Sequence, residues 1–182
     1  YIVTVFMATG YYAGYSYIEP FLQQVAGLDA SAITMCLTVF GAAGLCGSWL
    51  FGRFFDGHCF GFLGISLGGV ALALFAMKMS AAGIVSVLVM CAVWGCCATA
   101  FNVAFQAELI AYTPADASAV AMSIFSGLFN LGIGTGTAVG GMVVGSGGIA
   151  SIGYAGGAIA ALGVVLAVTL LFKSIRKMRL AA

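Results

Sequence analysis

Residues 117–172 read ASAVAMSIFSGLFNLGIGTGTAVGGMVVGSGGIASIGYAGGAIAALGVVLAVTLLF, a stretch that contains no charged side chain. At a rise of about 1.5 Å per residue, this stretch is too long for a single helix across a hydrocarbon core about 30 Å thick. The glycine-rich segment 145–148 supplies a break within it. We therefore expect two membrane-spanning helices, near residues 118–144 and 152–172.

The charges before this stretch divide the rest of the chain into further apolar runs. Charged residues make up 6% of the 182 residues, against about 25% in a typical soluble domain, and the mean hydropathy is +1.18. A soluble fold could not cover its surface with so few charges, whereas lipid tolerates such a surface. We predict an all-α membrane protein of six transmembrane helices, the first four of which lie near residues 1–18, 30–52, 60–77 and 84–105.

Positive residues indicate how this bundle is oriented. An even number of helices places both chain ends on one side, and that side would hold Arg53 and the basic tail 173–182, whereas Lys78 faces the other side. The positive-inside rule then puts both ends in the cytoplasm, at the inner membrane of the cell. The chain opens at Tyr1 within an apolar run, so we expect it to begin partway through a larger protein.

Glycines recur at four-residue spacing, most densely at Gly132, Gly136 and Gly140. On a helix this spacing makes a flat stripe that lets another helix approach closely. We interpret the stripe as helix packing, and a smooth surface for helices that slide stays open as an alternative.

Polar side chains at membrane depth are costly, so each is a candidate functional group. Tyr12, Tyr15 and Glu19 follow each other at spacings of three and four, which places them on one face of a continuous helix. They could line a polar cavity, and an aromatic belt at the headgroup level with a solvated Glu is an equal alternative. Asn102 and Gln106, one turn apart, could supply donors and acceptors for an uncharged hydroxylated solute, and hydrogen bonding between helices is the alternative.

Other polar residues have plainer interpretations. We assign Asn130 to hydrogen bonding between helices. Gly52 and Asp56 fall in the expected turn between the second and third helices, where they could form a gate or a simple polar turn. His58 has no partners for a metal site, and the six cysteines read as packing residues.

Several classes of function lack their motifs in this sequence. There is no HExxH motif, no phosphate-binding loop and no dinucleotide fingerprint. The single histidine lies outside the expected helices, so a serine nucleophile at membrane depth has no base. We expect no enzyme, no cofactor, no metal and no nucleic-acid partner.

Three strings resemble the C-terminal half of bacterial sugar efflux transporters, in the drug:proton antiporter branch of the major facilitator superfamily. They are YSYIEPF at 15–21, AMSIFSGLFNLGIG at 121–134 and IGY at 152–154, and the less specific LIAYTPAD at 109–116 resembles the loop before helix eleven. The resemblance covers essentially the whole chain and implies helices seven to twelve of a twelve-helix bundle. It also implies that Gly52 and Asp56 belong to the superfamily's gating loop motif, although Gly57 and His58 stand where an Arg is expected.

These observations predict a secondary active transporter that exports a sugar or sugar-like compound by alternating access, coupled to protons. Its partners would be the solute, protons, the lipid bilayer and a missing N-terminal half. A multidrug antiporter is the alternative within the same superfamily. A six-helix oligomeric pore or membrane scaffold is the alternative from another class.

Overall fold

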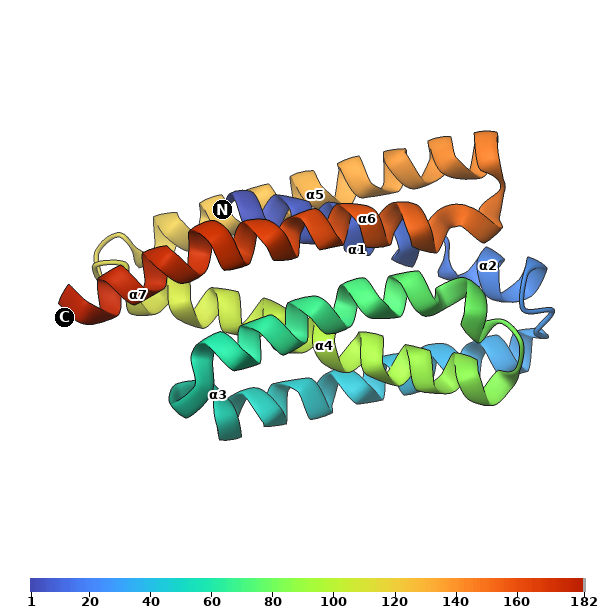
Figure 1. Ribbon diagram of the computed structural model, residues 1–182, viewed down its shortest axis with the longest axis horizontal. Helices are drawn as coiled ribbons and strands as arrows, with labels where there is room; N and C mark the ends of the chain where they lie inside the picture. The colour runs from blue at the N-terminus through green and yellow to red at the C-terminus, as the bar shows by residue number, and fades with distance from the viewer. Residues whose placement is uncertain (182) are drawn as a thin grey trace.

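The structure, a computed structural model, describes the backbone of residues 1–181 and the side chains of residues 1–176. All regular structure in these residues is helical (Figure 1). The α-helices are α1 (Ile2–Tyr15), α2 (Ile18–Gln24), α3 (Ala30–Ser80), α4 (Ile84–Ala111), α5 (Ser118–Gly147), α6 (Ile152–Leu166) and α7 (Phe172–Ala181). A short 3-10 turn, Ile149–Ser151, precedes α6, and a π-helical turn, Ala167–Leu171, joins α6 to α7.

Helix α3 is one element of 51 residues that bends back on itself. His58 leaves the helical region, with φ −139° and ψ 40°, and the chain reverses there into two arms, residues 30–57 and 59–80 (Figure 1). The turn between the second and third expected helices is therefore tighter than the loop predicted from Arg53, Asp56 and His58. If the two arms are counted separately, α1 is counted with α2, and α6 is counted with α7, the described helices form six segments.

The first segment is interrupted between Tyr15 and Ile18. Tyr17 adopts φ −119° and ψ 15°, outside the helical region. Pro20 explains the position of this break, because it has no N–H for the carbonyl four residues earlier and its ring collides with that carbonyl. The break resets the helical register, so that residues after it do not continue the faces of α1.

The remaining boundaries follow local chemistry. Asp29 caps α3 by accepting a hydrogen bond from Ala32 N at 2.9 Å. Gly148 ends α5 with φ 78°, a conformation that favours glycine, within the expected break. Helix α4 runs to Ala111, about two turns beyond the predicted end near residue 105.

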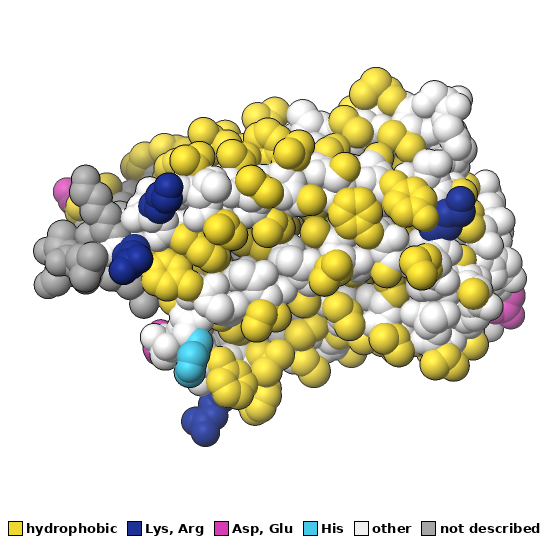
Figure 2. Space-filling model, viewed as in Figure 1, with side chains coloured by type: hydrophobic (Ala, Val, Ile, Leu, Met, Phe, Trp, Pro, Cys, Tyr) yellow, Lys and Arg dark blue, Asp and Glu magenta, His cyan; other side chains and the backbone are white. Residues whose placement is uncertain are grey.

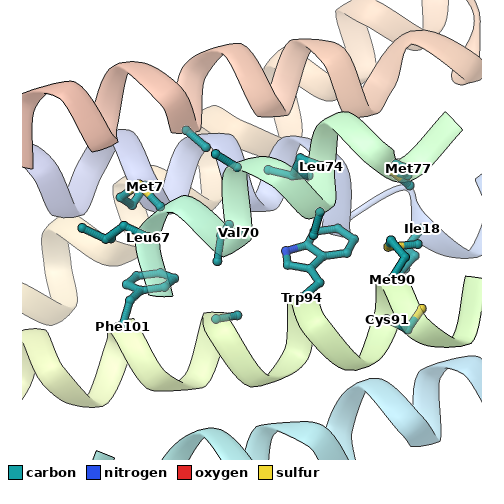
Figure 3. Packing of buried hydrophobic residues seen from close by; sticks show 14 of the residues in the cluster. Met7, Ile18, Leu67, Val70, Leu74, Met77, Met90, Cys91, Trp94 and Phe101 are labelled. Carbon is teal, nitrogen blue, oxygen red and sulfur yellow. The ribbon is translucent and has the colours of Figure 1, made fainter. Parts of the chain in front are cut away.

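Within the part of the chain that the structure describes, four segments are long and apolar enough to cross a membrane: Ala30–Ser80, Ile84–Ala111, Ser118–Gly147 and Ile149–Arg176. Hydrophobic side chains cover the length of the visible face, and its charged side chains lie near the two ends (Figure 2). Inside the bundle, Met7, Leu67, Leu74 and Trp94 are fully buried between α1, α3 and α4 (Figure 3). Together these features make the chain an all-α membrane protein.

Candidate functional site

Two neighbouring hollows carry most of the predicted polar residues. The first, of about 220 Å³, is lined by Tyr11, Tyr12, Phe40, Thr99, Asn102 and Phe129, among others. The second, of about 250 Å³, is lined by Asn102, Gln106, Phe125, Ser126, Phe129 and Asn130. Because both share Asn102 and Phe129, they adjoin along α4 and α5. The structure thus brings Tyr12, Asn102 and Gln106 to one site, and adds Asn130.

Hydrogen bonds between the lining residues determine which of their amide atoms remain available to the two hollows. Gln106 Nε2 donates to Asn102 Oδ1, one helical turn away, and Asn130 Nδ2 donates to Ser126 O at 2.9 Å. Among the described residues, no other hydrogen bond engages Asn102 Nδ2, Gln106 Oε1 or Asn130 Oδ1. The residues that line the hollows therefore retain one amide donor group and two carbonyl acceptors without a partner in the described part of the chain.

Aromatic rings form the wall behind these amides. Tyr11 and Tyr15 stack with ring centroids 5.2 Å apart and an interplanar angle of 19°. Tyr12 meets Phe129 edge to face at 6.1 Å, which joins α1 to α5 across the site. Tyr15 lines neither of the two hollows, so its observed position supports Tyr11 rather than contacting the space directly.

Trp94 anchors this aromatic wall from α4. Its side chain is fully buried, and its ring meets Tyr11 and Phe40 edge to face, each at 5.6 Å. Among the described residues, the indole Nε1 finds no hydrogen-bond acceptor. Aromatic faces are weak acceptors for such a group, so the wall holds Trp94 mainly by packing.

Glu19 lies apart from the tyrosines. It is exposed on α2 and lines a hollow of about 230 Å³ with Gln23 and Thr34. The expectation of one continuous face for Tyr12, Tyr15 and Glu19 fails because the helix is broken before Ile18. A prediction from spacing alone could not include that break.

Gly52 and Asp56 lie near the end of the first arm of α3, and both are exposed. A Cβ on Gly52 would meet nothing within 4 Å. Among the side chains that the structure describes, none forms an ion pair with Asp56. Gly52 precedes the kink at His58 by six residues and Asp56 by two, so a change in the angle between the arms would move both.

The glycine stripe of α5 lies against α1. A Cβ on Gly136 would stand 2.5 Å from Thr9 O, and one on Gly140 would stand 2.8 Å from Ala13 O. Hydroxyl pairs flank this contact, Thr9 with Thr135 at 3.0 Å and Ser16 with Thr137 at 2.8 Å, as measured between their side-chain oxygens. The α1–α5 contact is therefore a close backbone approach with hydroxyl pairs beside it.

Glu108 is a site candidate that was not predicted from the sequence, because the fourth helix was expected to end near residue 105. Helix α4 continues through it, and Glu108 lines a hollow of about 310 Å³ with Thr4, Tyr112 and Thr113. Its Oε1 accepts a hydrogen bond from Cys59 Sγ at 3.3 Å. The available signal was its spacing from Phe101 and Phe105, which places all three on the core-facing side of α4.

A helical membrane bundle with an uncharged polar site among its helices defines a membrane transport protein as its class. A comparison with protein families matches residues 1–181 to the Major Facilitator Superfamily, and the chain belongs to it. This superfamily consists of transporters, so the chain is a multi-pass membrane protein that takes part in the transport of small molecules.

Proposed function

We propose that this chain forms one wall of a secondary active transporter that exports a sugar or sugar-like compound. The observation that carries the proposal is the pair of adjoining hollows around Asn102 and Phe129. None of the residues that line these two hollows is charged. An uncharged site with amide donors, carbonyl acceptors and aromatic rings suits a neutral hydroxylated solute.

The same observation favours a sugar over a cationic drug. A cation bound among these helices would lose hydration, and a carboxylate would be needed to compensate it. The acids nearest in the chain, Glu19 and Glu108, line other hollows. The multidrug alternative is therefore the weaker one for this site.

The remaining parts of the proposal concern the whole transporter. The site is open on the side of Ser126 and Asn130, which are exposed on α5. A second six-helix half, related by an axis along the membrane normal, would close it and allow alternating access. We place the transporter in the inner membrane with both ends of this segment in the cytoplasm, and we assign export to proton antiport.

Transport into everted vesicles tests the solute site. With labelled arabinose as the probe, Asn102→Ala is expected to raise KM by roughly tenfold, because a lost hydrogen bond to a solute hydroxyl costs about 1–1.5 kcal/mol. Ser146→Ala is the matched control, since Ser146 lies at the end of α5 and donates only to Met142 O. Two results would contradict the assignment to sugar. One is an unchanged KM for arabinose in Asn102→Ala, and the other is inhibition of arabinose transport by a competing lipophilic cation.

Glu19 is our candidate for the acid of this chain that exchanges the transported proton. Its hollow on α2 is open, which gives a carboxyl there access to water. Glu19→Gln is expected to abolish the dependence of export on the pH gradient while solute binding persists. A Glu19→Gln transporter that still exports at a normal rate against a gradient would remove this role.

A further inference from the structure

A third region of the surface is a groove in which the two arms of α3 meet α4 near the kink. It has a volume of about 470 Å³, within the range of about 300–1,000 Å³ typical of ligand sites. Leu50 and Phe54 of the first arm, Phe62 and Ile65 of the second, and Cys97 and Ala100 of α4 line it. The solute site shares none of these residues, so the groove is separate from it.

The groove lies on the outside of the bundle, among exposed apolar side chains. Ile65 is 75% exposed, and Trp49 beside Leu50 is 67% exposed. From His58 to Ser66, both of which line it, the groove follows the second arm for about 12 Å at the helical rise. That length is close to one leaflet, half of a hydrocarbon core about 30 Å thick. An acyl chain of a single lipid therefore fits its length and its apolar lining.

The charges at the kink end select the headgroup. His58 lines the groove there, and the exposed Arg53 precedes the lining residue Phe54. The acidic residue near the kink is Asp56. At 100° per residue, the angle around the helix axis from the lining residue Leu50 is about 120° for Asp56 and about 60° for Arg53. The groove end is thus nearer to Arg53 than to Asp56, and an arginine binds phosphate by charge-assisted hydrogen bonds.

We propose that this groove binds one anionic phospholipid, with an acyl chain between the arms of α3 and its phosphate at Arg53 and His58. A second copy of this chain fits less well as the occupant. The ten residues that line the groove are fewer than the roughly 20–30 on each side of a stable protein interface. The proposal does not depend on the transported solute.

Gly61 offers a clean way to fill the groove. It lines the groove, and a Cβ there would meet nothing within 4 Å, so Gly61→Leu adds a side chain without a collision in the bundle. Gly68, two turns along the same arm, is equally open and outside the lining, which makes Gly68→Leu the matched control. Both changes raise helix propensity.

The test is native mass spectrometry of the purified, full-length protein released from nanodiscs of equal phosphatidylglycerol and phosphatidylcholine. One retained phosphatidylglycerol is expected, and it should be lost in Gly61→Leu but kept in Gly68→Leu. Arg53→Gln should lower the retained phosphatidylglycerol by roughly tenfold, as the loss of a charged hydrogen bond implies. Unfolding temperatures in detergent establish that each variant is folded.

Two outcomes would overturn the proposal. Equal lipid retention by Gly61→Leu and Gly68→Leu would show that the lipid binds elsewhere. The second outcome is that the native protein retains no lipid and forms a dimer, which Gly61→Leu converts to a monomer. This result would assign the groove to a second copy of the chain.

Discussion

Trp94 is the largest fully buried side chain among the described residues, and its ring contacts those of Tyr11, Tyr15 and Phe40. A buried indole N–H without an acceptor costs free energy, so packing must compensate for it. Gly14 makes room for the ring, since a Cβ there would stand 3.3 Å from the Trp94 ring. The tryptophan therefore stabilises the bundle by its shape rather than by its polar atom.

Trp94→Phe is accordingly expected to cost less than about 1 kcal/mol of unfolding free energy, because it keeps most ring contacts and removes the unpaired donor. Trp94→Ala leaves a cavity and should cost about 3–5 kcal/mol. Thermal unfolding of the purified protein in one detergent compares the two. Equal losses would mean that the N–H makes a stabilising hydrogen bond.

At the scale of single residues, the sequence predicted the positions of the amide side chains better than those of the acidic side chains. Asn102 and Gln106 lie one turn apart within one uninterrupted helix, so their shared face follows from the helical period. Glu19 follows a break in its helix, and Glu108 depends on where α4 ends. Pro20 is a local signal for the break before Glu19, although the spacing of the polar residues does not include it. The point at which α4 ends depends on packing, so the position of Glu108 does not follow from the local sequence.

At the scale of helices, small residues occupy the positions at which the backbones of two helices approach each other closely. The stripe of α5 presses on α1 at Gly136, whereas Gly134 of the same helix is exposed and open. In lipid, such contacts gain their free energy from van der Waals packing and hydrogen bonds rather than from the hydrophobic effect. The hydroxyl pair of Thr9 and Thr135 contributes to the same contact.

Gly136→Ala is expected to destabilise the protein by about 1–3 kcal/mol, since a methyl group 2.5 Å from Thr9 O forces the helices apart. Gly134→Ala is the control and should be neutral, or stabilising by up to about 1 kcal/mol through helix propensity. Unfolding temperatures of the two purified variants report the difference. If Gly136→Ala unfolds at the temperature of Gly134→Ala, the two helices do not approach this closely.

At the scale of the whole molecule, the charged side chains on the visible face lie near the two ends of an apolar body (Figure 2). The kink of α3 and helix α7 lie towards the end at which the C-terminus lies, and the last turn of α3 lies at the opposite end (Figure 1). Lys173 and Arg176 belong to α7, and Lys78 belongs to the last turn of α3. The predicted tail residues Lys177 and Arg179 have side chains outside the described residues. The described charges agree with the orientation that we propose.

Fusions test that orientation in cells. Alkaline phosphatase joined after Ala82 is expected to be active, because the positive-inside rule places that turn outside the cytoplasm. The same enzyme joined after Ala182 should be inactive, and a fluorescent protein there should fluoresce. The opposite pattern of activities would reverse the topology and the direction assigned to transport.

The sequence alone determined that the chain is a bundle of apolar helices in a membrane, because charge and hydropathy act residue by residue along it. It also located the glycine stripe and the amide pair, since each lies within one regular helix. Only the tertiary structure decided that Tyr12 and Asn102 share a site, that Glu19 is separate from it, and that Glu108 lines a hollow. These depend on contacts between distant segments and on helix breaks, which packing of the whole bundle selects.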